Sequence, residues 1–276
     1  MHINFSSWKA FTECPRKFYY EFVKKAAPTV EVNDYFKVYG TTIEKFFELF
    51  CNQWRFKTPY MPEDFIRYKM KPIFDSVIEN STIIWTSPGC KLSAEEIFEE
   101  TVNDAFTIME SQNQNFFLNT KSEISIQLDM KNKHKMTGRI DFIHKEAVGT
   151  GVTIIDGKGS MKMGKNVDEK QLFFYALMYF FLNKKLPDNL GFFYYRFNEY
   201  VPVELNSVIL NTFRAALSLD IKKMTSGEGY EPTPCAKSCK YCKYLIGCEK
   251  GLEAKAKRAR PSKVDLEGDG LITFGL

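Results

Sequence analysis

Two carboxylates and a lysine lie in two neighbouring apolar segments in the middle of the chain. Asp141 stands in Thr-Gly-Arg-Ile-Asp-Phe-Ile-His (137–144), and Asp156 and Lys158 stand in Val-Thr-Ile-Ile-Asp-Gly-Lys-Gly (152–159). Successive side chains of a strand point to opposite faces, so Asp156 and Lys158 are expected on the same face. Carboxylate oxygens suit a hard divalent cation, and an ammonium group beside them can position a water and neutralise charge on a phosphate. The spacing therefore indicates metal-assisted hydrolysis of a phosphodiester.

A second chemical pattern lies towards the C-terminus. Cys239 and Cys242 form a C-x2-C pair, and Cys248 follows them. Three thiolates this close suit a tetrahedral metal ion or an iron–sulfur cluster, and either needs a fourth ligand. Local spacing favours Cys235 and a zinc-ribbon-like site, whereas Cys14 is the candidate from the other end of the chain. Spacing alone does not separate zinc from iron–sulfur.

The segments that must position these groups show both helical and strand patterns. A serine N-cap signal begins an N-terminal helix, and Pro15 fits the first turn of a second one. Apolar residues recur at helical spacing from residue 40 to about residue 54. The remaining predicted elements are strands at 123–129, 137–144, 152–157, 190–198 and 201–205, and helices at 168–182 and 207–224. This order predicts an α/β or α+β domain.

Composition narrows the class of protein only slightly. The 276 residues carry 38 Lys+Arg against 34 Asp+Glu, a formal charge of +4, which is compatible with a nucleic-acid groove without requiring one. Seven cysteines in a chain with no apolar signal-peptide core or membrane-spanning run argue for metal ligation or burial rather than a disulfide framework. We therefore expect a cytoplasmic protein with no membrane partner.

The last residues of the chain differ from the rest. A basic run is followed by acidic residues and then by the apolar segment 271–276; the basic residues are Lys255, Lys257, Arg258, Arg260 and Lys263. Such a composition predicts a flexible tail over 254–276. The apolar end is a candidate docking peptide for a protein partner such as a sliding clamp.

Five blocks of the sequence resemble the RecB-type branch of the PD-(D/E)XK nuclease superfamily. The resemblance runs from residue 6 to about residue 250 and is strongest to the iron–sulfur members, which include the CRISPR adaptation nucleases and the nuclease domains of helicase–nucleases. Cys14-Pro-Arg-Lys-Phe-Tyr-Tyr is similar to the opening helix of the family. Asp141 and Asp156-Gly-Lys resemble its G-R-I-D and (D/E)-x-K motifs. Gln171 and Tyr175 match its Q-x3-Y helix, and the final three cysteines match its C-x2-C-x5-C.

The resemblance implies a fold and a domain organisation. A restriction-endonuclease-like core, with a central mixed sheet flanked by helices, would form one nuclease domain over 1–253. A helical insertion at about 55–120 would precede the catalytic core at about 121–206, and the cysteine segment would occupy 235–250. The resemblance also implies a 4Fe–4S cluster that joins the N- and C-terminal regions, with Cys235 left over; its ligands would be Cys14, Cys239, Cys242 and Cys248.

The resemblance further implies a metal site for one or two Mg²⁺ or Mn²⁺ ions. Its ligands would be Asp141, Asp156 and the Gly157 carbonyl, with Lys158 as the catalytic lysine. Family members usually carry Gly-x-x-x-His in the helix before the insertion, but this chain has Glu44 in place of the histidine. A glutamate is an oxygen donor that also suits these ions. The replacement of histidine by glutamate therefore affects which metal ion the site prefers. Gln171 and Tyr175 are expected to face the site, while Glu123 is a candidate with an equally plausible structural role.

The expected activity is that of a metal-dependent DNA nuclease. We expect an exonuclease that favours single-stranded DNA or free ends and acts in DNA recombination, repair or processing in a prokaryote or phage. Tyr19, Tyr20 and residues 194–196 are candidates for stacking on bases. The alternative from another class is a catalytically weak DNA-binding or scaffold subunit of a recombination or CRISPR adaptation complex.

Overall fold

A computed structural model describes residues 1–29, 33–54, 61–87, 89–112, 114–130, 133–146, 149–164 and 167–259. The chain divides into two compact units. Unit 1 comprises Met1–Phe5 and Asn33–Leu219, and unit 2 comprises Ser6–Val32 and Asp220–Leu276. The candidate carboxylates belong to unit 1, and the candidate cluster cysteines belong to unit 2.

Unit 1 is built on a six-stranded sheet. Its strands are β1 (His2–Ile3), β2 (Thr120–Asp129), β3 (Lys135–Lys145), β4 (Val152–Lys158), β5 (Asn189–Tyr194) and β6 (Glu199–Val203). The path runs β1-β3-β4-β5-β6, and β2 pairs with β3. The β1–β3 and β4–β5 pairs are parallel, whereas β2–β3, β3–β4 and β5–β6 are antiparallel. The prediction of an α/β fold with a central mixed sheet is confirmed.

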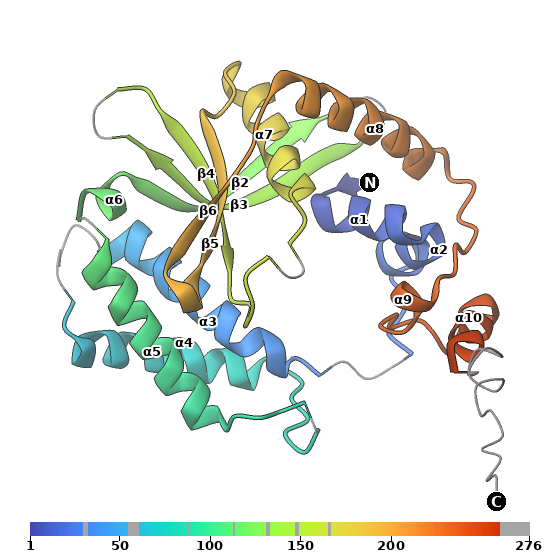
Figure 1. Ribbon diagram of the computed structural model, residues 1–276. Helices are drawn as coiled ribbons and strands as arrows, with labels where there is room; N and C mark the ends of the chain where they lie inside the picture. The colour runs from blue at the N-terminus through green and yellow to red at the C-terminus, as the bar shows by residue number, and fades with distance from the viewer. Residues whose placement is uncertain are drawn as a thin grey trace, which may run out of the picture. The chain divides into compact units, whose positions relative to one another are not determined.

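Helices cover the sheet of unit 1 on both faces. Figure 1 shows α3, α4 and α5 on one side of the sheet and α7 on the other. The helices are α3 (Tyr35–Leu49), α4 (Glu63–Glu79), α5 (Ala94–Ser111), α6 (Gln114–Leu118), α7 (Lys170–Asn183) and α8 (Ser207–Ser226), and one turn of π-helix, Phe50–Trp54, extends α3. The stretch expected to be a helical insertion, about 55–120, is thus occupied by α4 to α6.

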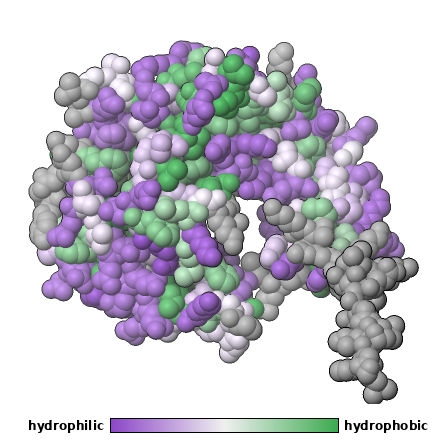
Figure 2. Space-filling model, viewed as in Figure 1, coloured by the Kyte–Doolittle hydropathy of each residue, from purple (hydrophilic) through white to green (hydrophobic). Residues whose placement is uncertain are grey.

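The packing of these helices follows their sequence patterns. The inner faces of α3, α4 and α5 form one apolar cluster that also includes Phe142 of β3 and Ile155 of β4. Over α5 the viewed face is mainly hydrophilic (Figure 2), as expected for an amphipathic helix whose other face is buried. By contrast, α7 buries consecutive residues from Leu172 to Met178. A helix that is apolar all round must be buried, and α7 packs on β2, β3, β4 and β5.

Two glycines bring α3 against the end of β4. A Cβ atom on Gly159 would lie 2.7 Å from the Cα atom of Gly40 in α3. No real side chain fits at that distance, so position 159 must be glycine for the backbones to approach this closely, whereas a Cβ atom on Gly40 would lie 3.7 Å from the Cα atom of Gly159, an ordinary contact. Glu44 follows Gly40 by one helical turn and lies on the same face of α3. The contact between the glycines therefore positions Glu44 beside β4.

Unit 2 joins the N-terminal and C-terminal segments of the chain. Its helices are α1 (Phe5–Glu13, whose first residue belongs to unit 1), α2 (Pro15–Phe18), a π-helical turn (Tyr19–Val23), residues 220–226 of α8, α9 (Ala236–Cys239) and α10 (Glu249–Ala259). Pro15 begins α2, as predicted. The serine N-cap prediction was wrong, because α1 already begins at Phe5 and Ser7 is buried inside the helix. Aromatic rings join the two segments: Tyr19 stacks on Tyr230 at 5.3 Å between centroids.

Only part of the predicted tail lies in the described residues. Helix α10 continues to Ala259, so residues 254–259, which were assigned to the flexible tail, are helical. Residues 260–276, with Arg260, Lys263 and the candidate docking peptide 271–276, lie outside the described residues. Within the described chain, no helix combines the length and apolar character that a membrane crossing needs.

Candidate functional site

Strands β3 and β4 stop pairing where their carboxylates face each other. Phe142 pairs with Ile155, and one step further along the two strands Asp141 stands opposite Asp156. No backbone pair forms there. Instead, the Gly157 N–H donates a hydrogen bond to Asp141 Oδ2 at 2.9 Å. The register of the hairpin thus places two acidic side chains on the same face at the point where the strands part.

A third carboxylate reaches Asp141 from the opposite side. On β2, the pairs Ser122–Phe142 and Ile124–Ile140 bracket Glu123 opposite Asp141. Glu123 has a φ of 54°, a left-handed conformation that costs a non-glycine residue about 1–2 kcal/mol. Strain of this kind concentrates at functional sites. The sequence left the role of Glu123 open, and a positive φ at a strand residue is not visible in an alternating pattern.

Helix α3 adds a fourth carboxylate. Ligand oxygens of Glu44, Glu123 and Asp141 all lie within 4.8 Å of one another. Asp156 is not in that set. It is 1% exposed, and neither of its carboxylate oxygens accepts a hydrogen bond from the described residues, although Lys158 forms an ion pair with Oδ2. This ion pair confirms that Asp156 and Lys158 share a face.

The electrostatics of the site favour a bound cation. Burial, followed by the charge of Glu123, raises the pKa of Glu44 to about 7. Burial and then the charge of Asp156 raise the pKa of Asp141 well above its ordinary value, and burial also raises the pKa values of Glu123 and Asp156. Clustered buried carboxylates fit a divalent ion, and an all-oxygen donor set suits a hard one such as Mg²⁺ or Mn²⁺.

Lys158 is held by a chain of side chains from α7. Its Nζ atom donates to Gln171 Oε1 at 3.3 Å, and Gln171 Nε2 donates to Tyr175 Oη at 3.3 Å. Burial raises the pKa of Tyr175, which therefore stays protonated at neutral pH. Gly138 of β3 lets α7 pack closely on the sheet, because a Cβ atom at this position would lie 2.6 Å from Met178 Sδ of α7. The structure thus places Gln171 and Tyr175 beside the carboxylates and the lysine.

One set of sequence-predicted contacts is wrong. Tyr194 and Tyr195 were candidates for stacking on bases, but they are 2% and 3% exposed. Arg196 forms an ion pair with Glu100, and its guanidinium lies 3.6 Å from the centroid of the Tyr39 ring. These residues are part of the interior of unit 1 because β5 is a central strand and the 3-10 turn Tyr195–Phe197 folds inward after it.

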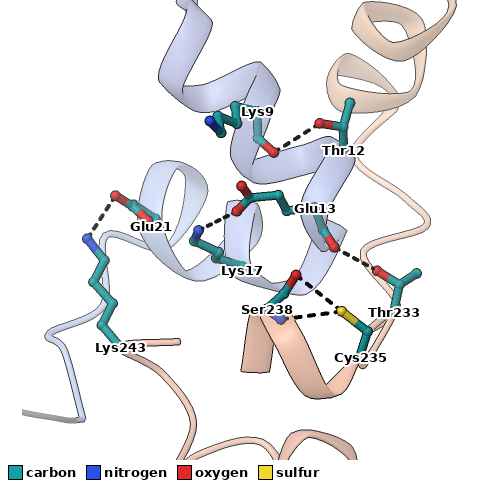
Figure 3. A network of polar contacts seen from close by, with 9 residues as sticks. All are labelled: Lys9, Thr12, Glu13, Lys17, Glu21, Thr233, Cys235, Ser238 and Lys243. Atoms are coloured by element: carbon teal, nitrogen blue, oxygen red, sulfur yellow. Dashed lines mark hydrogen bonds and ion pairs between the residues drawn. The ribbon is translucent and has the colours of Figure 1, made fainter. Parts of the chain in front are cut away.

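Unit 2 contains a cavity lined by cysteines. Cys14, Cys239, Cys242 and Cys248 are among its lining residues, and Cys235 is not. The exposed Cys235 instead caps α9: its Sγ accepts a hydrogen bond from the Ser238 N–H at 3.3 Å (Figure 3). Local spacing in the sequence favoured Cys235 as the fourth ligand, but the fold brings Cys14 to the other three.

Polar contacts around this cavity tie the two segments of unit 2 together. Figure 3 shows Thr233 donating to the Glu13 carbonyl at 3.2 Å and Lys243 paired with Glu21 at 2.8 Å. Burial is the main cause that raises the pKa values of Cys239 and Cys242. Without a metal, both groups are therefore neutral thiols at pH 7.

The thiol spacing bears on what the cysteines could bind. In the described chain no three cysteine Sγ atoms lie within 4.8 Å of one another. A single zinc ion with bonds of about 2.3 Å places its four sulfurs about 3.8 Å apart. The cysteine sulfur atoms of unit 2 are therefore spread more widely than the four sulfur ligands of a single zinc ion.

A mixed sheet that presents clustered carboxylates beside a lysine defines a metal-dependent hydrolase site. Residues 2–249 match the family model of the PD-(D/E)XK nuclease superfamily, and the chain belongs to this superfamily. Membership implies metal-dependent nuclease activity. Among solved structures, "Crystal structure of SSO0001" is 12% identical with a TM-score of 0.40, covering 90% of this chain and 85% of that chain. No curated protein matches this chain significantly.

Proposed function

We propose that this protein is a Mg²⁺- or Mn²⁺-dependent deoxyribonuclease. The observation that carries the proposal is the group of buried carboxylates with raised pKa values around Asp141, with Lys158 beside it. Glu44, Glu123, Asp141, Asp156 and the Gly157 carbonyl are the groups that would hold the metal. Superfamily membership supports hydrolysis of phosphodiester bonds as the reaction.

Each side chain around the carboxylates has a separate role in the proposed reaction. A bound metal ion supplies an activated water and Lewis-acid stabilisation of the phosphate. With a cation held by the carboxylates, Lys158 would no longer be needed to balance the Asp156 charge, and its ammonium would be free to orient the attacking water. Gln171 keeps the ammonium of Lys158 in place through its 3.3 Å hydrogen bond, and Tyr175 fixes the Gln171 amide. Lys158 also lies 5.2 Å from the Phe192 ring centroid, which limits the access of bulk water to it.

A groove between α3 and α4 supports a single-stranded substrate. It has a volume of about 620 Å³, and its lining includes Lys45, Glu48, Tyr68 and Lys69. Tyr68 is 71% exposed, and Lys69 Nζ lies 5.5 Å from the centroid of its ring. An exposed ring beside lysines can stack on a base of any identity while the ammonium groups bind the backbone. The charge of Glu48 also raises the pKa of Glu123, so the groove lies beside the carboxylates.

We further propose that the enzyme is an exonuclease of the RecB-like branch. The support is the set of blocks shared with that branch, including Gln171, Tyr175 and the cysteines. The proposed setting is DNA recombination, repair or processing in the cytoplasm of a prokaryote or of a phage-infected cell. An exonuclease digests end-labelled linear single-stranded DNA and leaves circular single-stranded DNA intact, whereas an endonuclease degrades both.

We also propose that Cys14, Cys239, Cys242 and Cys248 hold a 4Fe–4S cluster. A cubane spreads its thiolate ligands over four iron atoms and so accepts a wider set of sulfurs than zinc does. Its role here is structural, because its ligands come from both segments of unit 2. Visible thiolate–iron absorbance is expected in the purified protein, and Cys14→Ala removes it while Cys235→Ala leaves it intact. Zinc in place of iron, with no visible absorbance, contradicts this assignment.

The test of the nuclease proposal uses labelled single- and double-stranded DNA with and without Mn²⁺. The wild-type protein is expected to digest DNA only with the metal, and Lys158→Ala is expected to lose cleavage while keeping its melting temperature. Digestion by Lys158→Ala at the wild-type rate contradicts the proposed site. A wild-type protein that binds DNA and never cleaves it supports the scaffold alternative instead.

A further inference from the structure

One polar atom at the candidate metal centre has no role in the mechanism above. The hydroxyl of Tyr195 is buried and has no hydrogen-bond partner in the described part of the chain. An unmade hydrogen bond of this kind costs about 1–3 kcal/mol. The ring itself is well held: it stacks on Phe47 with an interplanar angle of 9° and contacts Phe193 edge-on. Packing therefore fixes the direction of the hydroxyl.

The hydroxyl points at the backbone of the catalytic strand. A Cβ atom on Gly157 would lie 2.0 Å from Tyr195 Oη, so the oxygen lies against the Cα atom of Gly157. The N–H of this glycine donates to Asp141. After burial, the charge of Asp141 is the largest cause that raises the pKa of Tyr195, followed by Glu44 and Asp156. A tyrosine hydroxyl carries one proton to donate, so Tyr195 can act as a hydrogen-bond donor to a carboxylate of this group.

A buried water on the other side of the ring is not an adequate partner. The small cavity there is lined by Phe47, Phe142, Ile155 and other apolar residues. A buried water needs two to four polar partners, and this lining offers none besides Tyr195. The acceptor for the hydroxyl is therefore expected on the carboxylate side, where Asp156 Oδ1 also lacks a hydrogen-bond partner among the described residues.

We propose that Tyr195 is a positioning residue of the metal centre, whose hydroxyl donates a hydrogen bond to the Asp141 carboxylate when the cation is bound. The inference rests on the proposed function. In the metal-free protein this donor has no acceptor among the described residues, and a bound cation would hold the Asp141 carboxylate where it can accept the bond. The hydrogen bond therefore adds to metal affinity and not to the stability of the metal-free fold. It also gives a reason for glycine at position 157, since any side chain there would displace the hydroxyl.

The test compares Tyr195→Phe with Tyr194→Phe, using Mn²⁺ alone as the probe. Hydrogen bonds to charged groups contribute enough for Tyr195→Phe to weaken Mn²⁺ binding about tenfold or more in calorimetric titration. The metal-free melting temperature of Tyr195→Phe is expected to stay the same or rise, since an unpaired buried hydroxyl is removed. Tyr194 is equally buried, but its hydroxyl accepts from the Gly164 N–H at 3.0 Å. Tyr194→Phe is therefore expected to lower the melting temperature and leave Mn²⁺ affinity unchanged.

The outcomes separate this inference from the proposed function. If the wild-type protein binds Mn²⁺ and cleaves DNA but Tyr195→Phe binds Mn²⁺ equally well, the hydrogen bond to Asp141 is wrong and the nuclease assignment stands. A lower metal-free melting temperature with unchanged affinity overturns the inference as well, because it shows a purely structural hydroxyl. A wild-type protein that neither binds Mn²⁺ nor cleaves DNA overturns both.

Discussion

The carboxylate site of unit 1 and the cysteine site of unit 2 are assembled by opposite means. In unit 1, the register of β2, β3 and β4 places Glu123 and Asp156 on either side of Asp141. In unit 2, Cys14 comes from the N-terminal segment, while Cys239 and its neighbours come from the C-terminal one. The first site depends on regular backbone pairing, whereas the second depends on contacts between segments far apart in sequence.

The two sites also respond differently to an absent inorganic group. The carboxylates repel one another and have raised pKa values, but the sheet and the apolar cores of unit 1 hold their backbone. The cysteines are neutral thiols without a metal, and they lie on two chain segments far apart in sequence. The metal of unit 1 should therefore serve reactivity, and the group in unit 2 should serve folding. The predictions below test this distinction, in order of decreasing effect.

The largest effect is expected from Asp156→Ala. Loss of this carboxylate should lower the cleavage rate about 1,000-fold or more, because the metal loses a ligand at the reacting centre. The fold should survive, since removing a buried carboxylate also removes its desolvation cost. Cleavage assays and melting curves measure these two consequences separately. Asp129→Ala, at an exposed carboxylate at the end of β2, is the matched control and should cleave normally.

Removal of the proposed cluster should unfold one unit only. Chelation of iron is expected to increase amide hydrogen exchange in α2 and in residues 239–248, because the cluster that links the cysteines of the two segments is removed. Exchange in β3 and β4 should stay slow. Exchange that rises equally in both regions would show that the cluster supports the whole molecule, and no rise anywhere would show that unit 2 does not need it.

A smaller effect is expected at the groove of unit 1. Tyr68→Ala should weaken binding of a fluorescent single-stranded oligonucleotide about 5- to 100-fold, the range expected for the loss of one stacked base. Tyr68→Phe keeps the ring and should bind normally. Tyr241 is a matched control in unit 2, because it is 77% exposed and Lys240 Nζ lies 4.9 Å from its ring centroid. Equal losses in Tyr68→Ala and Tyr241→Ala would remove the distinction between the two surfaces.

The sequence predicted the central sheet well, and the roles of Lys158, Gln171 and Tyr175 stay predictions. The patterns of apolar residues located the strands β2, β3 and β4 and the helix α7 to within a few residues, because these patterns are local. The match to the nuclease superfamily is also confirmed. Glu123 was harder to assign, because it has a positive φ that no local pattern reveals.

Other features depend on tertiary packing. The burial of Tyr194 and Tyr195 could not be predicted, since an aromatic residue after a strand is compatible with an exposed or a buried ring. The capping role of Cys235 likewise depends on the geometry at the start of α9. Local spacing had favoured this residue as a ligand because Cys235, Cys239, Cys242 and Cys248 follow one another at short intervals.

The smallest predicted effect is a pH dependence that belongs to unit 1 alone. A raised carboxyl pKa stabilises the fold below the ordinary value of 4.5, and this stability is lost as the pH rises to about 7, the pKa of Glu44. The metal-free protein should therefore melt a few degrees lower at pH 8 than at pH 5.5, and Glu44→Gln should reduce this difference. Burial lowers the pKa of His144, which acts in the opposite direction but equally in both proteins. Burial raises the pKa values of Cys239 and Cys242, so these thiols stay neutral between pH 5.5 and pH 8 and do not contribute to the difference. A pH dependence that is unchanged in Glu44→Gln would therefore contradict the electrostatic account of the carboxylate site.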